Sequence, residues 1–186
     1  MLTGPNVWSS QDKKLKSTII SESDLRKRVA ELAAEISQDF FGKDVLLIGV
    51  LKGAFLFMAD LAREISVPVE VDFMAVSSYG SATKTSGVVR ILKDLDLDLT
   101  GRFVIVVEDI IDSGLTLSYL IRNLKFRHPS SITVCALLVK DGVDLEKLDI
   151  GYVGFKIPNE FVVGYGLDAA ERYRNLPYIA IYDENA

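Results

Sequence analysis

Acidic and hydroxyl side chains come together in residues 104–117, which read VIVVEDIIDSGLTL. Backbone N–H groups at a helix start can bind a phosphate, and a glycine lets the backbone approach it closely. Carboxylates repel a phosphate unless hydroxyls or a cation lie between them, so this mixture is typical of a site for a phosphorylated sugar with Mg²⁺ nearby. The residues that can contact such a ligand are Glu108, Asp109, Asp112, Ser113, Gly114, Leu115 and Thr116, together with the hydroxyl of Ser118.

Each of these residues also has an ordinary explanation when it is taken alone. Asp and Ser are favoured at helix N-caps, so Asp112 or Ser113 could do no more than begin a helix. Glu108 and Asp109 could belong to a solvated loop. An acidic pair, an anion-binding loop and a helix start in succession are much rarer than any one of them, and the combination favours a ligand site.

The elements on either side are those that would position this site. Residues 103–107 are an unbroken run of β-branched and aromatic side chains, which predicts a strand buried on both faces of a parallel sheet. A helical pattern follows from about Leu115 to Arg127. Open α/β sheets bind their ligands beyond the carboxyl ends of the strands, where the acidic pair is expected.

The same order of strand, turn and helix occurs earlier in the chain. Residues 45–50 predict a second buried strand, and a helix is expected from about Phe55 to Glu64. Lys52 and Gly53 lie between them, where a charge and backbone N–H groups can hold a diphosphate, although a plain surface turn has the same composition.

The remaining elements follow from hydrophobic spacing. Ser21 and Asp24 form a capping-box pattern that opens a helix ending before Gly42, whereas residues 1–18 are polar and unpatterned. Glu70 and Asp72 alternate with apolar residues, as on the exposed side of a strand. The predicted strands beyond these are residues 69–76, 88–93, 132–139, 152–155 and 178–182, and residues 157–168 predict an irregular cover.

Two further segments allow both a structural and a functional interpretation. Residues 77–87 form either the tip of a long mobile hairpin or a flexible connection. Lys140 stands at the carboxyl end of a predicted buried strand, where it could contact a ligand or only precede the turn at Gly142.

The composition excludes several classes of protein. A chain of 186 residues suits one α/β domain, and 49% hydrophobic with 25% charged residues is ordinary for a globular protein. The net charge of −5 argues against general nucleic-acid binding. One cysteine, Cys135, and one histidine, His128, make a zinc site or a Ser-His-Asp triad improbable. No apolar run reaches the about 18 residues of a membrane span, so we expect no membrane association and a cytoplasmic location.

VIVVEDIIDSGLTL resembles the phosphoribosyl-pyrophosphate signature of type I phosphoribosyltransferases, and most closely that of the hypoxanthine-guanine branch. Lys140, IPNEFVVGYGLD at residues 157–168 and the region of Arg174 carry the resemblance to this branch. LKGA at residues 51–54 matches the family's pyrophosphate loop, which implies a cis peptide between Leu51 and Lys52. The likeness covers residues 45–182. It implies an α/β fold with a central, mainly parallel sheet flanked by helices, in a single domain over residues 1–186.

The resemblance also implies a small hood over residues 157–175 with the N-terminal segment, and a mobile flap over residues 77–87. It assigns the acid-base role at purine N7 to Asp112, and the metal Mg²⁺ to Glu108, Asp109 and Asp168. The purine contacts that it implies are Lys140, Phe161, Val162 and Asp168. Phosphoribosyl pyrophosphate would contact Lys52, Gly53, Ser78, Tyr79, Glu108, Asp109, Asp112, Ser113, Gly114, Leu115, Thr116 and Arg174. Ala169 and Ala170 depart from the family, where an aromatic residue is expected.

The implied reaction transfers a phosphoribosyl group from phosphoribosyl pyrophosphate to N9 of hypoxanthine or guanine. The implied partners are these small molecules and further copies of the chain, as a dimer or tetramer. Two other interpretations stay open: an enzyme of the same fold with xanthine or a pyrimidine as acceptor, and a regulator that binds RNA. The sequence does not rank hypoxanthine, guanine and xanthine.

Overall fold

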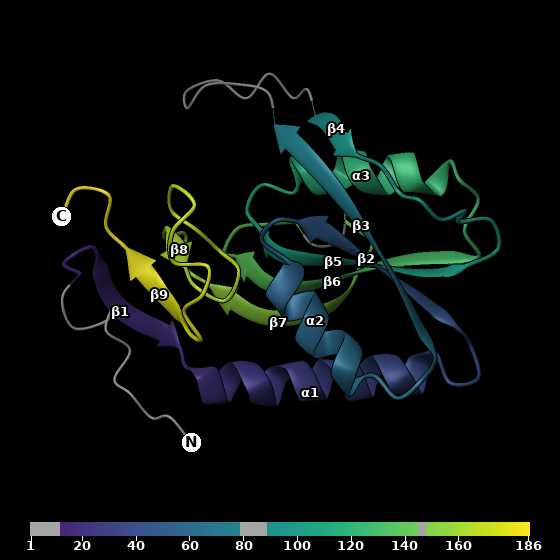
Figure 1. Ribbon diagram of the computed structural model, residues 1–186, viewed down its shortest axis with the longest axis horizontal. Helices are drawn as coiled ribbons and strands as arrows, with labels where there is room; N and C mark the ends of the chain where they lie inside the picture. Colours follow the sequence, from purple (N-terminus) through teal and green to yellow (C-terminus); the bar gives the residue numbers. More distant parts are fainter. Residues whose placement is uncertain (1–11, 79–88, 145–147) are drawn as a thin grey trace.

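Six strands form the central sheet of the computed structural model, which describes residues 12–78, 89–144 and 148–186 (Figure 1). Their order is β4-β3-β2-β5-β6-β7, and all neighbours are parallel except β3 and β4. The predicted mainly parallel sheet is therefore confirmed. The strands are β2 (Val45–Leu51), β3 (Val69–Ser78), β4 (Val89–Lys93), β5 (Phe103–Ile111), β6 (Ser131–Lys140) and β7 (Ile150–Ile157).

The strand order reverses between β2 and β5. The chain passes from β2 to β3 on one side and later adds β5, β6 and β7 on the other. In open α/β sheets such a switch point leaves a crevice at the carboxyl ends of the two strands. The segments after β2 and β5 are the ones that carry Lys52 and Asp112, so the topology brings both predicted anion-binding segments to one crevice.

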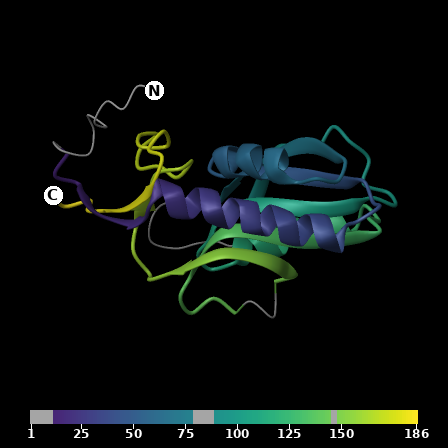
Figure 2. The same cartoon turned by 90° about the horizontal axis from the view of Figure 1, so that it is seen from below.

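Helices cover both faces of the sheet. The helices α1 (Glu22–Asp39) and α2 (Phe55–Glu64) share one hydrophobic core with the sheet, and α3 (Leu115–Lys125) packs in a second core on the other face. In Figure 2, α1 lies in front of the sheet. Ser21 caps α1 by accepting a hydrogen bond from the Asp24 N–H at 3.1 Å, which confirms the predicted capping box. The predicted limits of α2 are also confirmed. Among the described residues, none of these helices is long and apolar enough to span a bilayer.

A second, three-stranded sheet has the order β1-β9-β8 and comprises β1 (Leu15–Ile20), β8 (Val162–Val163) and β9 (Ile179–Tyr182). We call this sheet, with residues 158–178, the hood. Figure 1 shows it beyond the ends of β6 and β7 to which their arrows point. The strand β1 was not expected, because residues 15–20 lack a clear alternation. Its partner β9 lies at the opposite end of the chain, and antiparallel pairing with it forms the strand.

The alternation expected in β3 is wrong at Asp72, which is only 7% exposed. Its carboxylate accepts hydrogen bonds from the N–H groups of Phe73 at 2.7 Å, Asp96 at 2.9 Å and Leu97 at 3.1 Å. Lys93 of β4 lies 3.6 Å away. Asp72 thus binds the backbone that follows β4, a contact between distant residues that no local pattern predicts.

Replacement of Asp72 by Asn is expected to lower the free energy of unfolding by about 1–3 kcal/mol at pH 7. Burial raises the pKa of Asp72, but the three backbone donors and Lys93 outweigh it, so the net pKa is lowered. A lowered carboxyl pKa stabilises the fold above the unfolded value of about 3.9, and this stabilisation is lost as the pH falls through the lower folded pKa. Urea unfolding of the wild type and the variant at pH 7 and below pH 4 measures the loss of stability and its decrease in acid.

Asp44→Asn is the control, because it removes the same charge from an exposed turn. A loss of stability in Asp72→Asn that matches the control at pH 7, or that does not shrink in acid, would contradict this role of Asp72.

Candidate active site

The loop after β5 surrounds a cavity of about 120 Å³. The strand β5 continues to Ile111, so Glu108 and Asp109 lie within the strand and the loop begins only at Asp112. Gly114 is the N-cap of α3 with φ of 73°, and α3 starts at Leu115 as predicted. No side chain caps this helix, which leaves N–H groups of its first turn open to a ligand. The cavity is lined by Glu108, Ile110, Ile111, Asp112, Ser113, Gly114, Thr116 and Leu117.

Glu108 and Asp109 point to opposite faces of the sheet. Glu108 is 8% exposed and lines the loop cavity on the α3 side, whereas the Asp109 carboxylate lies against Gly53. Burial, with the charge of Asp109, raises the pKa of Glu108 well above its usual value. Burial also raises the pKa of Asp109 to about 6, although the N–H of Ile110 donates to it at 2.8 Å.

The residues that follow β2 form a second cluster of site residues at the same end of the sheet. The peptide between Leu51 and Lys52 is cis, as the family resemblance implies. Gly53 packs so closely that a Cβ there would lie 1.5 Å from Oδ2 of Asp109. On its other side, a Cβ on Gly166 of the hood would lie 2.0 Å from the Gly53 carbonyl oxygen. Gly166 therefore has room only for glycine, whereas a side chain at Gly53 would have to displace the Asp109 carboxylate.

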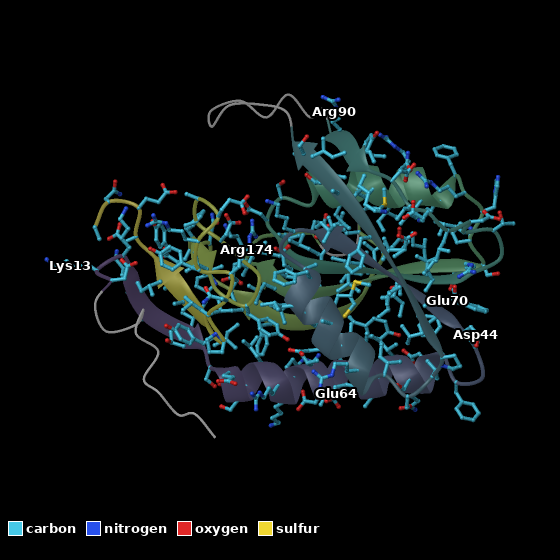
Figure 3. All side chains as sticks on the ribbon, in the orientation of Figure 1. Lys13, Asp44, Glu64, Glu70, Arg90 and Arg174 are labelled. Carbon is cyan, nitrogen blue, oxygen red and sulfur yellow. The ribbon has the colours of Figure 1, made fainter. Side chains whose placement is uncertain are left out.

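Arg174 connects the hood to this group, and Figure 3 shows it between the hood and the central sheet. Its guanidinium lies 2.8 Å from Asp168 and 3.1 Å from Glu171, and it donates to the Gly166 carbonyl at 2.8 Å. Its Nε is buried without a hydrogen-bond partner among the described residues. Glu171 also pairs with Lys52 at 3.0 Å. The Glu171 carboxylate thus lies between the two cations. The hydrogen bonds that it accepts from Lys52 and Arg174 lower its pKa.

Asp112 and Lys140 form the third group. Lys140 Nζ lies 3.5 Å from Asp112 Oδ1, and the Lys140 side chain is 14% exposed while that of Asp112 is 70% exposed. Two other predicted purine contacts lie in the hood. The ring of Phe161 packs against Tyr182 with centroids 5.6 Å apart, and Val162 is buried beside β9. The structure thus brings together the predicted residues Asp112 and Lys140, but no contact among the described residues joins Phe161 to them.

Part of the predicted flap falls outside the described residues. The backbone of Ser78 ends β3 and pairs with Val89 of β4, as in the base of a hairpin. Tyr79 and the rest of the flap to Gly87 lie outside the described ranges, so their predicted contacts stay predictions.

Among the described residues, no group of three or more Asp, Glu, His or Cys side chains is arranged to hold a metal ion. The three predicted Mg²⁺ ligands are divided, because Glu108 points away from the group that contains Asp109 and Asp168. The charge of Asp168 nevertheless raises the pKa of Asp109, so these two carboxylates share one region. Mg²⁺ commonly binds one or two carboxylates together with substrate phosphates, and this pair fits that pattern.

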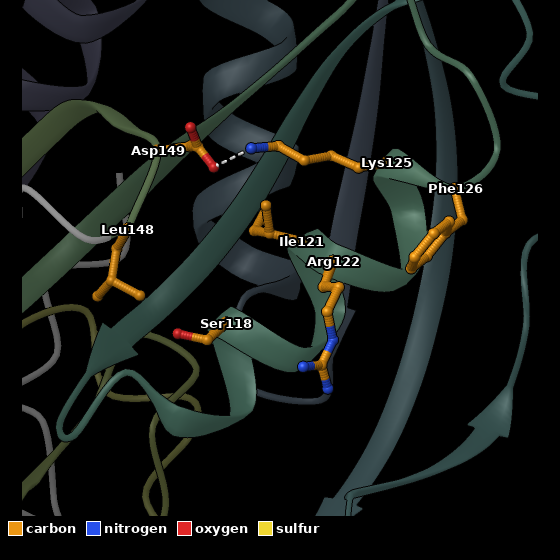
Figure 4. Close-up of a pocket in the computed structure, with 7 residues that line it drawn as sticks. All are labelled: Ser118, Ile121, Arg122, Lys125, Phe126, Leu148 and Asp149. Atoms are coloured by element: carbon orange, nitrogen blue, oxygen red, sulfur yellow. Dashed lines mark hydrogen bonds and ion pairs between the residues drawn. The ribbon is translucent and has the colours of Figure 1, made fainter.

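A separate cavity of about 430 Å³ lies along α3 (Figure 4). An ion pair of 2.6 Å between Lys125 and Asp149 lies at its edge, and Leu148 forms part of its wall. The same Leu148 packs on Gly114, where a Cβ would lie 2.6 Å from it. Of the ligand contacts predicted from the sequence, only Ser118 is among the described residues that line this cavity.

Two residues of the site were missed by sequence reasoning. Glu171 is three residues before Arg174, but its pairing with Lys52 joins positions 119 residues apart. Gly166 was noted only as part of an irregular segment. Its contact with Gly53 depends on how the hood meets the sheet, and no local signal reports that contact.

A mainly parallel sheet with an anion loop after β5 and a hood at its carboxyl edge is the type I phosphoribosyltransferase fold. The model of the phosphoribosyl transferase domain family matches residues 18–170. The hypoxanthine-guanine phosphoribosyltransferase of Mycobacterium avium is 56% identical over 175 residues, which cover 91% of this chain and 86% of that protein. The Bacillus subtilis protein of the same name is 50% identical over 167 residues, covering 90% and 93%.

A crystal structure of a hypoxanthine-guanine phosphoribosyltransferase from Bacillus anthracis superposes with a TM-score of 0.85. It is 51% identical, and the match covers 91% of this chain and 99% of that one. The chain therefore belongs to the hypoxanthine-guanine phosphoribosyltransferase family.

Proposed function

We propose that this chain transfers the phosphoribosyl group of phosphoribosyl pyrophosphate to N9 of hypoxanthine or guanine, releasing pyrophosphate. The observation that carries the proposal is the position of Asp112. It begins the anion loop and lies 3.5 Å from Lys140, on a chain 56% identical to a hypoxanthine-guanine phosphoribosyltransferase. One residue thus connects a phosphate cavity to a lysine that can select a base.

The sugar phosphate occupies the loop cavity in this proposal. Backbone N–H groups at the start of α3 and the hydroxyls of Ser113 and Thr116 donate to it. Glu108 and Asp109 lie beside the ribose, where a carboxyl group can accept hydrogen bonds from hydroxyls. Lys52 and Arg174 supply positive charge for the pyrophosphate.

The purine edge that carries O6 and N7 fits the pair of Lys140 and Asp112. O6 of hypoxanthine or guanine is an acceptor on this edge and suits the ammonium donor of Lys140. A free base that carries its proton on N7 and attacks through N9 must lose that proton, and in this proposal the Asp112 carboxylate accepts it. The distance of 3.5 Å between Asp112 and Lys140 supports this assignment. In this proposal Lys140 recognises the base and Asp112 takes part in proton transfer.

Departure of pyrophosphate leaves positive charge on the ribose, so the transition state resembles an oxocarbenium ion. Carboxylates near the ribose stabilise that charge, whereas Lys52 and Arg174 stabilise the charge of the leaving group. Mg²⁺ belongs to the proposal as well. Held by Asp109, Asp168 and the substrate oxygens, it would neutralise the pyrophosphate.

Three further features belong to the same proposal. Residues 1–186 act as one domain, because the hood residues Asp168 and Arg174 complete a site that begins on the sheet. The chain forms a dimer or tetramer, which the exposed apolar side chains of Val71 on β3 and Leu92 on β4 support. The location is cytoplasmic, because sugar phosphates do not cross bilayers unaided.

Replacement of Lys140 by Gln is expected to weaken hypoxanthine binding by about 1.5–3 kcal/mol, because a charge-assisted hydrogen bond to O6 is lost. Binding of phosphoribosyl pyrophosphate should stay unchanged, since Lys140 has no part in that subsite. Calorimetric titration with each ligand measures both. Lys156→Gln, on the neighbouring strand β7, is the control. Equal hypoxanthine affinity in Lys140→Gln and the wild type would contradict this role.

The reaction is tested by Mg²⁺-dependent release of pyrophosphate with hypoxanthine, guanine, xanthine, adenine and uracil in turn. Release with hypoxanthine or guanine supports the proposal and ranks these bases. Release only with xanthine or uracil would identify another acceptor. No release with any base, from folded protein that binds RNA at low salt, would favour a regulatory role.

A further inference from the structure

Glu171 contacts both cations that the proposed function assigns to pyrophosphate. Its Oε1 lies 3.0 Å from Lys52 Nζ, and its Oε2 lies 3.1 Å from Arg174 Nη2. The two oxygens of one carboxylate thus bridge a lysine of the sheet and an arginine of the hood. This is the charge arrangement that a bound diphosphate would create.

The backbone holds Glu171 in this position. Its φ is +63°, and the neighbours Ala170 and Tyr173 also have positive φ values of 50° and 73°. Such values are uncommon for residues other than glycine, and they concentrate at functional sites. The N–H of Glu171 donates to Asp168 Oδ2 at 2.8 Å, which fixes the turn against the residue that also holds Arg174.

Arg174 does not need Glu171 to keep its orientation. Asp168 at 2.8 Å and the Gly166 carbonyl at 2.8 Å hold the same guanidinium. Glu171 and Lys52 are both well exposed, with side-chain exposures of 64% and 66%. An exposed pair exchanges readily with another anion, so the Glu171 carboxylate can leave while Arg174 stays in place.

We propose that Glu171 is an internal anion that occupies the cations of the pyrophosphate subsite in the free protein and is displaced when pyrophosphate binds. This inference rests on the proposed function, because it takes Lys52 and Arg174 as the pyrophosphate ligands. Glu171 then lowers the affinity of the subsite and favours release of the product, since its carboxylate returns to both cations as pyrophosphate leaves.

Glu171→Gln tests the proposal, because it keeps the shape of the side chain and removes its charge. We expect the variant to bind inorganic pyrophosphate about 3- to 10-fold more tightly in calorimetric titration with Mg²⁺, as expected when two exposed ion pairs no longer compete. The KM for phosphoribosyl pyrophosphate should fall in the same direction. Glu184→Gln, an equal charge change at an exposed position outside the site, should stay within about 2-fold of the wild type.

Equal or weaker pyrophosphate binding in Glu171→Gln would overturn the inference. So would a lower midpoint of thermal unfolding with unchanged affinity, which is the result expected of a purely structural contact between hood and sheet. If the wild type itself binds neither pyrophosphate nor phosphoribosyl pyrophosphate, the proposed function fails and this inference with it. Wild-type binding with no difference in the variant refutes the role of Glu171 alone.

Discussion

Replacement of Asp112 by Asn is expected to lower turnover by about 100- to 10,000-fold, which is the range for loss of a general acid-base group. An amide cannot accept the N7 proton, while the anion loop that surrounds the sugar phosphate keeps its backbone donors. Binding of phosphoribosyl pyrophosphate should therefore stay close to that of the wild type. Steady-state kinetics with hypoxanthine, combined with calorimetric titration of phosphoribosyl pyrophosphate, separates the two effects.

Asp141→Asn is the matched control, because Asp141 is exposed and follows Lys140 directly. Its turnover should stay near that of the wild type, which excludes a general effect of lost negative charge at this edge. Unchanged turnover in Asp112→Asn would refute the acid-base role. A loss of phosphoribosyl pyrophosphate binding as large as the loss of turnover would mean that Asp112 acts on substrate binding.

Gly166→Ala should produce the largest loss of stability at the site, about 2–4 kcal/mol in the free energy of unfolding. The φ of Gly166 is +103°, and an added Cβ would lie 2.0 Å from the Gly53 carbonyl oxygen. Relief of this clash must move the hood away from the segment that carries Lys52. Pyrophosphate binding should weaken too, because Lys52 and Arg174 would no longer approach one anion. Urea unfolding and calorimetry measure the two effects.

Gly101→Ala separates backbone strain from the clash. Gly101 has φ of +74° and no atom within 4 Å of the position of a Cβ. Its substitution should cost only about 1 kcal/mol and leave pyrophosphate affinity unchanged. If Gly166→Ala matched Gly101→Ala in both measurements, the close contact between hood and sheet would have no energetic importance.

Local patterns predicted the sheet and the anion loop, because buried parallel strands appear in sequence as continuous apolar runs. The runs at β2, β5 and β6 and the turn at Gly114 each contain their own signal within about ten residues. The capping box at Ser21 is equally local. The acidic pair was expected beyond the end of this strand, but β5 extends through both residues, so their side chains point to different faces of the sheet.

Contacts between distant segments were not predictable in this way. The burial of Asp72 depends on backbone donors of residues beyond β4, and β1 exists because β9 pairs with it. The pairing of Glu171 with Lys52 likewise joins the hood to the sheet. In each case the contact depends on a partner that is distant in the sequence. The residues around either partner alone therefore do not predict it.

The hood has a consequence for the order in which the protein matures. In its sheet, β1 pairs with β9, so the register joins Leu15 to Tyr182 across nearly the whole chain. Closing so long a loop is entropically costly and slow, and it requires that β9 has left the ribosome. The anion loop after β5 can form earlier, with the central sheet. The proposed phosphate loop can therefore form before the hood has closed, and the pairing of β9 with β1 is the step that completes the hood.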